Sequence, residues 1–241
     1  MAVSKIKINL FIYNKISTYQ DNTGIELIKA IQNGNYNSIK VLKNNQRSFV
    51  ELIEYNNSKL ILKIPKEKNT RRWIRFTTLF RSGEGRRALD NMLKLQNLGL
   101  QTTIPVVLFE KRTCGFLTDS FYIYKYGEAE AISKPHFDKV IDCLNFLHSK
   151  NFLHHDAHLD NFYIKDNKVF LIDANIKKMR FFKGFQTANE FAYLAKMNPE
   201  IIPSIKTDKQ NFYRKLAELY QNYLDSWRKF KRMIRKQTKI N

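Results

Sequence analysis

Three side chains in the second half of the chain have the types and the spacing that phosphoryl transfer requires. Asp156 and Asn161 stand in the pattern H-x-D-x-x-x-x-N, which begins at His154, and a β-like run then leads to Asp173. One carboxylate can orient an acceptor hydroxyl and accept its proton, while an amide oxygen and a second carboxylate hold Mg²⁺ against nucleotide phosphates. The pattern therefore predicts Asp156 as the catalytic base and Asn161 and Asp173 as the metal ligands.

The same spacing is typical of the catalytic loop of protein-kinase-like phosphotransferases. A helix-like segment leads into the loop, and a β-like run at residues 168–172 precedes the last aspartate. We expect His154, which opens the pattern, to brace the loop through a backbone hydrogen bond. The alternative is a polar surface turn followed by an acidic residue that ends a strand.

Three β-like runs in the first third of the chain predict an antiparallel meander. They cover residues 38–43, 48–55 and 59–64, and Asn-rich turns separate them. In a phosphotransferase of this kind the first turn covers the nucleotide phosphates, but residues 44–48 contain no glycine. Phosphate contacts there would have to come from side chains or from a few backbone N–H groups.

Lys63 and Glu84 are the predicted nucleotide-binding residues of this region. Lys63 ends an apolar strand, the position from which an ammonium group reaches the α- and β-phosphates; a solvated lysine is the alternative. Residues 85–98 follow a helical period that Gly99 stops. Glu84 stands at the start of this helix and is the candidate partner of Lys63, although an acid there also favours the helix dipole.

The order of these segments predicts an α+β fold of the protein-kinase-like, two-lobed type. A small lobe with an antiparallel sheet, residues 1–126, would carry the strands and the helix that cover the nucleotide. A mainly helical large lobe, residues 127–241, would carry the catalytic loop and a basic C-terminal helix. Further strands are expected at 3–13, 103–110 and 120–126, and further helices at 25–31 and from Ser133 to about Lys150.

Composition narrows the class of partner. The chain has 241 residues, 43% of them hydrophobic, which suits a globular protein with a sizeable core. Its net charge of +20 implies an anionic partner: nucleic acid, an acidic membrane surface or a phosphorylated substrate. Only two cysteines occur, Cys114 and Cys143, which favours a reducing cytosol. No apolar run approaches the ~18 residues of a membrane span, so we expect a cytoplasmic protein, soluble or peripheral on a membrane.

Two basic segments each have a structural and a functional interpretation. The first surrounds Trp73 and Phe76, and it either forms a solvated face or binds a phosphorylated or carboxylated acceptor through guanidinium groups. Its arginines are Arg71, Arg72, Arg75, Arg81, Arg86 and Arg87.

The second basic segment ends a long amphipathic helix, which we expect to pack on the core through its first half. The apolar stripe consists of Phe212, Leu216, Leu219, Tyr223, Trp227, Phe230 and Ile234. Past Asp225 the polar faces carry Arg228, Lys229, Lys231, Arg232, Arg235, Lys236 and Lys239. Aromatic residues interleaved with cations favour an interfacial anchor on an anionic membrane, and a solvated tail is the alternative.

Taken together, these residues make the chain similar to the bacterial lipopolysaccharide core heptose kinases, which are related to the Kdo kinases. The resemblance covers nearly the whole length. It is carried most clearly by the D-A-H-x-x-N-F version of the loop, and next by R-W-I-R-F and L-F-R-S before Gly99. It implies a kinase-like two-lobed fold, ATP with Mg²⁺, and a heptose or Kdo hydroxyl as acceptor. It assigns the roles given above to Lys63, Asp156, Asn161 and Asp173.

We therefore predict an ATP-dependent kinase that phosphorylates a heptose of the lipopolysaccharide inner core, with the core glycolipid and the anionic inner-membrane surface as partners and nucleic acid disfavoured. Ala174 and Asn175 replace the usual phenylalanine–glycine, and no A-P-E sequence follows; both favour a small-molecule or glycan acceptor. Two alternatives remain: a kinase for Kdo, another small molecule or protein, and an inactive kinase-like module that binds membrane or nucleic acid.

Overall fold

The computed structural model of the chain describes residues 2–7, 12–18, 23–67, 72–173, 175–205 and 211–237. The chain divides into two compact units, Met1–Glu128 and Ala129–Asn241. The sequence places this boundary after residue 126.

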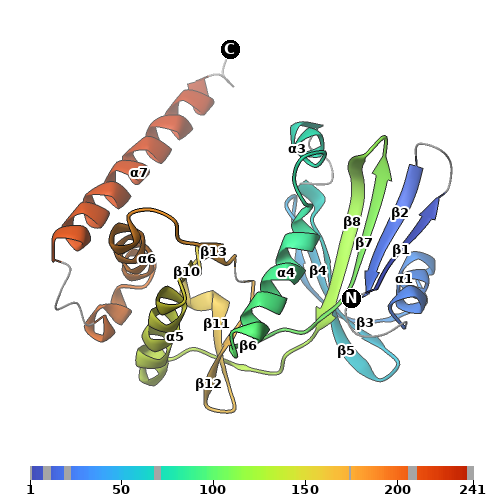
Figure 1. Cartoon of the computed structure of the whole chain (residues 1–241), viewed down its shortest axis with the longest axis horizontal. Helices are drawn as coiled ribbons and strands as arrows, with labels where there is room; N and C mark the ends of the chain where they lie inside the picture. The colour runs from blue at the N-terminus through green and yellow to red at the C-terminus, as the bar shows by residue number, and fades with distance from the viewer. Residues whose placement is uncertain are drawn as a thin grey trace. The chain divides into compact units, whose positions relative to one another are not determined.

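The first unit is built on a seven-stranded sheet in the order β1-β2-β7-β8-β5-β4-β3 (Figure 1), in which every paired strand is antiparallel to its neighbour. Its strands are β1 (Ala2–Lys7), β2 (Ile12–Thr18), β3 (Asn37–Asn44), β4 (Phe49–Tyr55), β5 (Ser58–Ile64), β7 (Pro105–Thr113) and β8 (Phe116–Lys125). Its other elements are α1 (Thr23–Asn33), α3 (Arg72–Thr77), α4 (Glu84–Asn97) and β6 (Gln101–Thr102).

The predicted meander is confirmed as β3, β4 and β5, and the predicted pair of strands at 103–110 and 120–126 is confirmed as the β7–β8 hairpin. That hairpin is longer than expected because its tight turn lies at Cys114 and Gly115, which both have positive φ. The single strand expected at 3–13 is two strands, β1 and β2, and residues 8–11 between them lie outside the described part of the chain.

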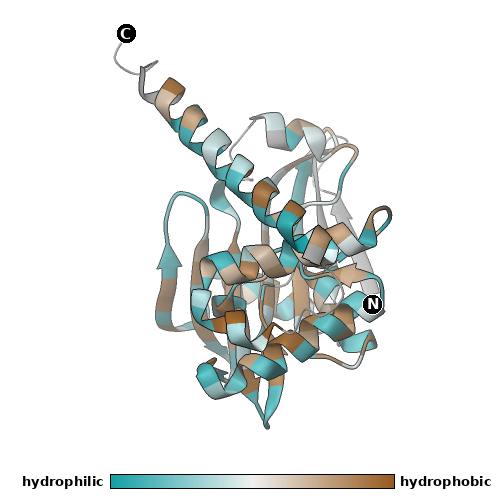
Figure 2. Ribbon diagram, turned by 90° about the vertical axis from the view of Figure 1, so that its left-hand side faces the viewer, coloured by the Kyte–Doolittle hydropathy of each residue, from teal (hydrophilic) through white to brown (hydrophobic). Residues whose placement is uncertain are grey.

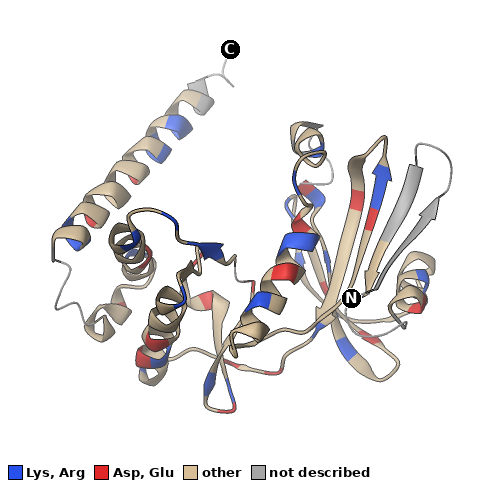
Figure 3. Ribbon diagram, viewed as in Figure 1, with Lys and Arg blue, Asp and Glu red and all other residues tan. Residues whose placement is uncertain are grey.

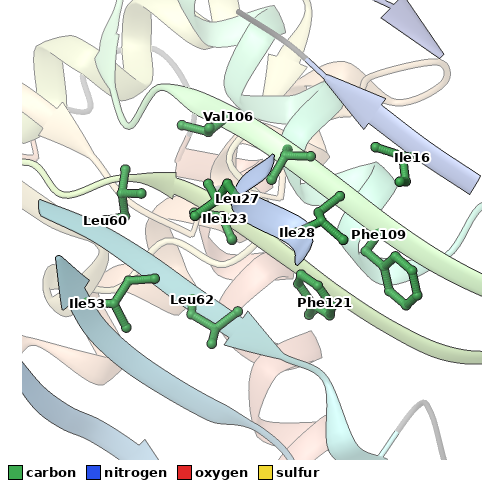
Figure 4. Packing of buried hydrophobic residues seen from close by; sticks show 11 residues of the cluster. Ile16, Leu27, Ile28, Ile53, Leu60, Leu62, Val106, Phe109, Phe121 and Ile123 are labelled. Carbon is green, nitrogen blue, oxygen red and sulfur yellow. The ribbon is translucent and has the colours of Figure 1, made fainter. Parts of the chain in front are cut away.

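The two faces of this sheet are covered by different helices. Helix α1 packs on one face, where Leu27 and Ile28 meet alternate residues of the central strands (Figure 4). Helix α4 packs on the opposite face, where Leu89 and Met92 contact Leu108 and Tyr122. Because successive strand residues point to opposite faces, the sequence neighbours of these sheet residues belong to the α1 core. The helix predicted at residues 85–98 is thus confirmed as α4, and its apolar face is buried.

The second unit is mainly helical, as predicted. It contains β9 (Glu130–Ala131), η1 (Lys134–His136), α5 (Phe137–Ser149), β10 (Phe152–Leu153), η2 (Leu159–Asn161), β11 (Phe162–Lys165), β12 (Lys168–Leu171), β13 (Lys177–Lys178), α6 (Lys183–Met197), η3 (Pro199–Ser204) and α7 (Asn211–Gln237). The apolar face of α5 is buried as expected. Strands β11 and β12 form a hairpin whose turn residues, Asp166 and Asn167, both have positive φ.

Helix α6 was not expected from the sequence. Its buried residues are Ala188, Glu190 and Leu194, so its inward face is small and partly charged. A face of this composition gives only a weak apolar period, which is the signal that identifies helices in a sequence.

Helix α7 packs on α6 through a face other than the predicted one. Ala217 and Gln221 are buried, whereas the apolar stripe is exposed along the described helix, with 67% of Leu219 and 61% of Tyr223 accessible. Hydrophobic residues recur along the length of α7 (Figure 2), and basic residues recur on its C-terminal half (Figure 3). The expectation that the first half buries this stripe is wrong, because α6 offers mostly small and polar side chains for packing.

Candidate active site

The predicted catalytic loop is a compact, internally hydrogen-bonded turn in the second unit. The backbone N–H of His158 donates to the carbonyl oxygen of Asp156 at 3.1 Å, and that of Asn161 donates to His158 at 3.0 Å. The side-chain Nδ2 of Asn161 also donates to the Asp156 carbonyl, at 2.9 Å. This commits the amide nitrogen to the loop, so the Oδ1 atom is the group of Asn161 that can ligate a cation.

Asp173 is brought next to this loop by the backbone. The N–H of Ile172 donates to the carbonyl oxygen of Asn161 at 3.0 Å, which places the residue after β12 beside η2. Asp173 itself has a φ of 49° and an exposed side chain. Asparagine and aspartate oxygens are hard donors of the kind that Mg²⁺ prefers, and Mg²⁺ is usually held by one or two protein ligands together with substrate phosphates.

A pair of protein oxygens fits such a shared ion, so the residues present are compatible with the predicted metal. The described part of the chain contains no cluster of three or more His, Cys, Asp or Glu side chains that could hold a metal ion by itself.

A buried carboxylate on α6 holds the start of the loop, and sequence reasoning missed it. Oε1 of Glu190 accepts the backbone N–H of His155 at 2.6 Å, and Oε2 accepts that of His154 at 3.3 Å. Oε2 also lies 2.8 Å from Nε2 of His148 on α5. Glu190 thus links two helices to the loop that carries Asp156. Because α6 was not predicted from the sequence, no pattern of residues indicated that Glu190 faces the loop.

The ring of His154 packs within the second unit, and the hydrogen bond of this residue is the one from its backbone N–H to Glu190. Its ring is completely buried and stacks on Phe162 at a centroid distance of 4.9 Å. Neither ring nitrogen has a hydrogen-bond partner among the described residues, so the ring itself does not brace the loop through a hydrogen bond. Burial lowers the pKa of the imidazole, although the charges of Glu190 and Asp156 act in the opposite direction. The lowered pKa favours the neutral form of the imidazole, and the ring fills buried space next to Phe162.

A cavity of about 290 Å³ opens beside Asp156, entirely within the second unit. Most of the residues that line it have polar side chains, among them Asp156, Gln186, Asn189, Tyr193, Gln221 and Arg228. These residues come from the catalytic loop, α6 and α7. The wall combines one carboxylate, one guanidinium, several amides and a phenol, which is the set of groups that binds polyhydroxylated molecules through hydrogen bonds.

In the first unit, Lys63 lies on the sheet face that α4 covers. Leu60 and Leu62 belong to the opposite core, so Lys63 alternates to the α4 side of β5. Its Nζ atom lies over the ring of Tyr122 at 5.8 Å from the centroid. The lysine predicted to bind phosphate is thus located on the face of the sheet where the predicted helix lies.

Glu84 begins α4 next to the same tyrosine. A Cβ atom at Gly85 would stand 2.9 Å from Cδ1 of Tyr122 and 2.7 Å from Cδ1 of Leu108, so the first turn of α4 approaches the sheet as closely as a glycine allows. Lys63 and Gly85, the residue after Glu84, thus both approach Tyr122, and the pairing of Lys63 with Glu84 stays a prediction.

The glycine-free turn between β3 and β4 is shaped by an asparagine. Oδ1 of Asn45 accepts the backbone N–H groups of Arg47 and Ser48, both at 2.9 Å. The carbonyl oxygen of Arg47 in turn accepts the N–H of Glu67 at 3.1 Å. The backbone N–H groups of Arg47 and Ser48 are thus used inside the turn, and any contact of this turn with phosphates stays a prediction.

The arginine-rich segment is only partly a solvated face. Arg86 pairs with Asp90 at 3.0 Å, Arg87 donates to the Gly83 carbonyl at 3.4 Å, and Arg75 donates to that of Thr118 at 3.4 Å. Arg71 and the side chain of Arg72 lie outside the described part of the chain. The described arginines thus take part in the structure of the first unit, and their predicted role in acceptor binding stays a prediction.

An antiparallel sheet with a lysine on its helix-covered face, and a helical unit with an Asp–Asn loop, define a protein of kinase-like fold. A solved structure, WaaP in complex with acyl carrier protein, shares this fold with a TM-score of 0.51. The similarity covers 85% of this chain and 86% of that chain, at 12% sequence identity.

Within this class, the chain belongs to the WaaY family of lipopolysaccharide core biosynthesis proteins, which it matches over residues 2–183. A relative, the lipopolysaccharide core heptose(II) kinase WaaY of Escherichia coli (strain K12), is 31% identical over 153 residues. That alignment covers 60% of this chain and 65% of the E. coli protein, which is slightly less than two thirds of the relative's length. The family resemblance predicted from the motifs is therefore confirmed.

Proposed function

We propose that this protein is an ATP-dependent kinase that transfers the γ-phosphoryl group to a heptose hydroxyl of the lipopolysaccharide core. The observation that carries the proposal is the loop in which Asn161 is tied to Asp156 and Asp173 follows beside it. Family membership and the name of the E. coli relative support the choice of acceptor.

In the proposed reaction, Asp156 orients the acceptor hydroxyl and receives its proton. The hydroxyl oxygen forms a bond to the γ-phosphorus, and the bond from that phosphorus to the β,γ-bridging oxygen breaks, leaving ADP. Asn161 and Asp173 would hold Mg²⁺, which supplies charge neutralisation at the phosphates when bound. Lys63 would neutralise the α- and β-phosphates, with Glu84 orienting its ammonium group.

The test is ADP release by the purified protein with ATP, Mg²⁺ and delipidated core oligosaccharide. Positioned acid–base groups contribute about 10²- to 10⁴-fold to such reactions, so Asp156→Asn should lower kcat by that order. Asp160→Asn is the matched control, since Asp160 is a highly exposed carboxylate of the same segment. Equal turnover by Asp156→Asn and by the wild type would reject the proposed mechanism.

The exposed stripe of α7 supports a second role, docking on an anionic lipid surface. Trp227 and Phe230 stack at 5.7 Å, and Nζ of Lys231 lies over the Trp227 ring at 5.1 Å. Lys229 and Arg232 are exposed on the same half of the helix. Aromatic residues flanked by cations suit the interface of a bilayer with acidic headgroups, where each cation contributes about 1 kcal/mol. None of the described helices has the length and hydropathy needed to cross a bilayer.

Cosedimentation with anionic and zwitterionic vesicles tests the docking. Removal of residues 228–241, or the double change Trp227→Ser and Phe230→Ser, should weaken binding to anionic vesicles at least ten-fold. Unchanged binding would reject the membrane role. Strongly salt-dependent binding to DNA or RNA, together with no turnover on any sugar acceptor, would instead favour the inactive module. With this role the protein would be cytoplasmic and peripheral on the inner membrane.

A further inference from the structure

Helix α7 has two different faces: one carries the exposed apolar stripe, and the other forms part of the cavity beside Asp156. Gln221 and Arg228 both line that cavity and are about two helical turns apart, so they project from the same side of the helix. The exposed apolar stripe lies on roughly the opposite side. The family match ends at residue 183, so this helix lies beyond the matched range.

Gln221 is a buried side chain with an unused acceptor. It is 5% exposed, and its Nε2 donates to Oδ1 of Asn189 at 2.9 Å. Its Oε1 atom has no hydrogen-bond partner among the described residues. Buried polar atoms are nearly always satisfied, so the unpaired oxygen of a residue on the cavity wall indicates a position for a ligand donor such as a sugar hydroxyl. The oxygen itself is buried, so the amide must turn toward the cavity to accept that donor.

Arg228 provides positive charge to the same cavity. Oδ1 of Asp225 lies 3.4 Å from its Nη1 atom, but Asp225 is also paired with Lys196 of α6. The carboxylate is therefore shared between two cations, and the guanidinium keeps net charge and further N–H donors for the cavity. Tyr193 lines the same cavity; burial raises the pKa of its hydroxyl, Asp156 adds to that rise and Arg228 opposes it.

We infer that this cavity is the acceptor site, in which Gln221 binds a hydroxyl of the sugar and Arg228 binds an anionic oxyacid group next to the hydroxyl presented to Asp156. The inference rests on the proposed kinase function and adds the recognition of the acceptor. A planar guanidinium binds phosphate and carboxylate equally well in geometry, so either group could be the one recognised.

Steady-state kinetics with three forms of the core oligosaccharide test this site: untreated, phosphatase-treated and carboxyl-amidated. Arg228→Gln should raise the KM for the untreated acceptor about ten- to hundred-fold, as expected for a lost charge-assisted hydrogen bond, with kcat and the KM for ATP little changed. Gln221→Met, which keeps the length of the side chain and removes both the Oε1 acceptor and the Nε2 donor to Asn189, should raise the same KM about ten-fold. Arg214→Gln is the matched control, an exposed arginine of α7 paired with Glu218 and not part of the cavity wall.

The treated acceptors identify the group. If phosphate is recognised, phosphatase treatment should raise the wild-type KM and abolish the difference between wild type and Arg228→Gln; amidation should do so if carboxylate is recognised. Arg228→Lys should be intermediate, and thermal unfolding checks that each variant is folded. A wild-type-like KM for folded Arg228→Gln, or a difference that neither treatment removes, would overturn the inference alone. If the wild type neither binds nor phosphorylates the untreated oligosaccharide, the proposed function fails as well.

Discussion

Glu190 is the residue on which the shape of the catalytic loop depends most directly. Its carboxylate accepts two backbone N–H groups from His154 and His155 and contacts His148, all in a buried setting. A charged acceptor with several donors is stronger than a neutral one, and its loss leaves buried donors unpaired. The orientation of Asp156 therefore depends on a helix that begins after the loop has ended.

We predict that Glu190→Gln lowers the free energy of unfolding by about 1–3 kcal/mol, because the amide replaces one accepting oxygen with a donor. It should also lower kcat while leaving the KM for ATP near its wild-type value. Urea denaturation and ADP release measure the two effects. Asp160→Asn, an exposed carboxylate of the same segment, is the control. A denaturation midpoint equal to that of the wild type would contradict this role.

The buried imidazole of His154 should make the stability of the protein depend on pH. Burial lowers its pKa in the folded protein, outweighing Glu190, Asp156 and Asp173, which raise it; His158 acts with burial. The unfolded chain titrates near ~6.5. Below that pH the unfolded state takes up a proton that the folded state does not, so stability is fully present above ~6.5 and falls as the pH falls, by at most about 1.4 kcal/mol per unit.

His154→Phe keeps a ring on Phe162 and removes the titrating group. Its free energy of unfolding should therefore change less between pH 7 and pH 5 than that of the wild type. His136→Gln, at a partly exposed position, should retain the wild-type slope. Denaturant titrations at several pH values give the comparison, and parallel curves for the wild type and His154→Phe would disprove it.

Among the helices, α7 packs on the rest of its unit through a face of small and polar side chains. Ala217 has no accessible surface, whereas Leu219 is mostly exposed. The docking on α6 also uses the Lys196–Asp225 ion pair and an edge contact between Phe185 and Tyr220 at 5.7 Å. Helix docking here depends on close approach rather than on a large apolar contact.

We predict that Ala217→Leu destabilises the second unit by about 1–3 kcal/mol, because the added atoms have no space against α6. Leu219→Ser removes a larger apolar group but should change stability by at most about 0.5 kcal/mol, since that side chain faces solvent. Thermal unfolding of the two variants distinguishes the faces. The opposite order of effects would mean that the apolar stripe is the packed face.

The same helix explains which parts of the structure the sequence could predict. Ile53, Leu60 and Leu62 belong to one core, and Leu60 and Leu62 are alternate residues of their strand, so the sequence pattern predicts the strands that pair as β4 and β5. For α7 the pattern determines the helix but not which face packs, because that depends on the residues that α6 presents. The role of Glu190 depends on a contact across 35 residues with His155, and no local pattern encodes it.

At the scale of the whole molecule, each unit contains one cysteine. Cys114 is exposed in a hairpin turn of the first unit, and Cys143 is buried in α5 of the second. Burial raises the pKa of the Cys143 thiol to about 12, so its reactive thiolate is scarce at neutral pH. Labelling of Cys114 therefore reports on the native first unit, and labelling of Cys143 reports on unfolding of the second unit.

We predict that a thiol reagent labels Cys114 rapidly in the native protein and Cys143 only after the second unit opens. Peptide mass spectrometry after labelling in increasing urea measures both rates, with Cys114→Ser and Cys143→Ser as single-thiol controls. Equal labelling of the two cysteines without denaturant would show that α5 is not the stable core of its unit.

The two different faces of α7 also limit how far the cavity can lie from a lipid surface. An α-helix with its side chains is only about 10–12 Å across. If the outer stripe rests on lipid headgroups, the cavity on the inner side opens within about that height above them. The helix would then act as a spacer that selects sugars by their distance from the bilayer, admitting residues near the lipid anchor and excluding those farther along the chain.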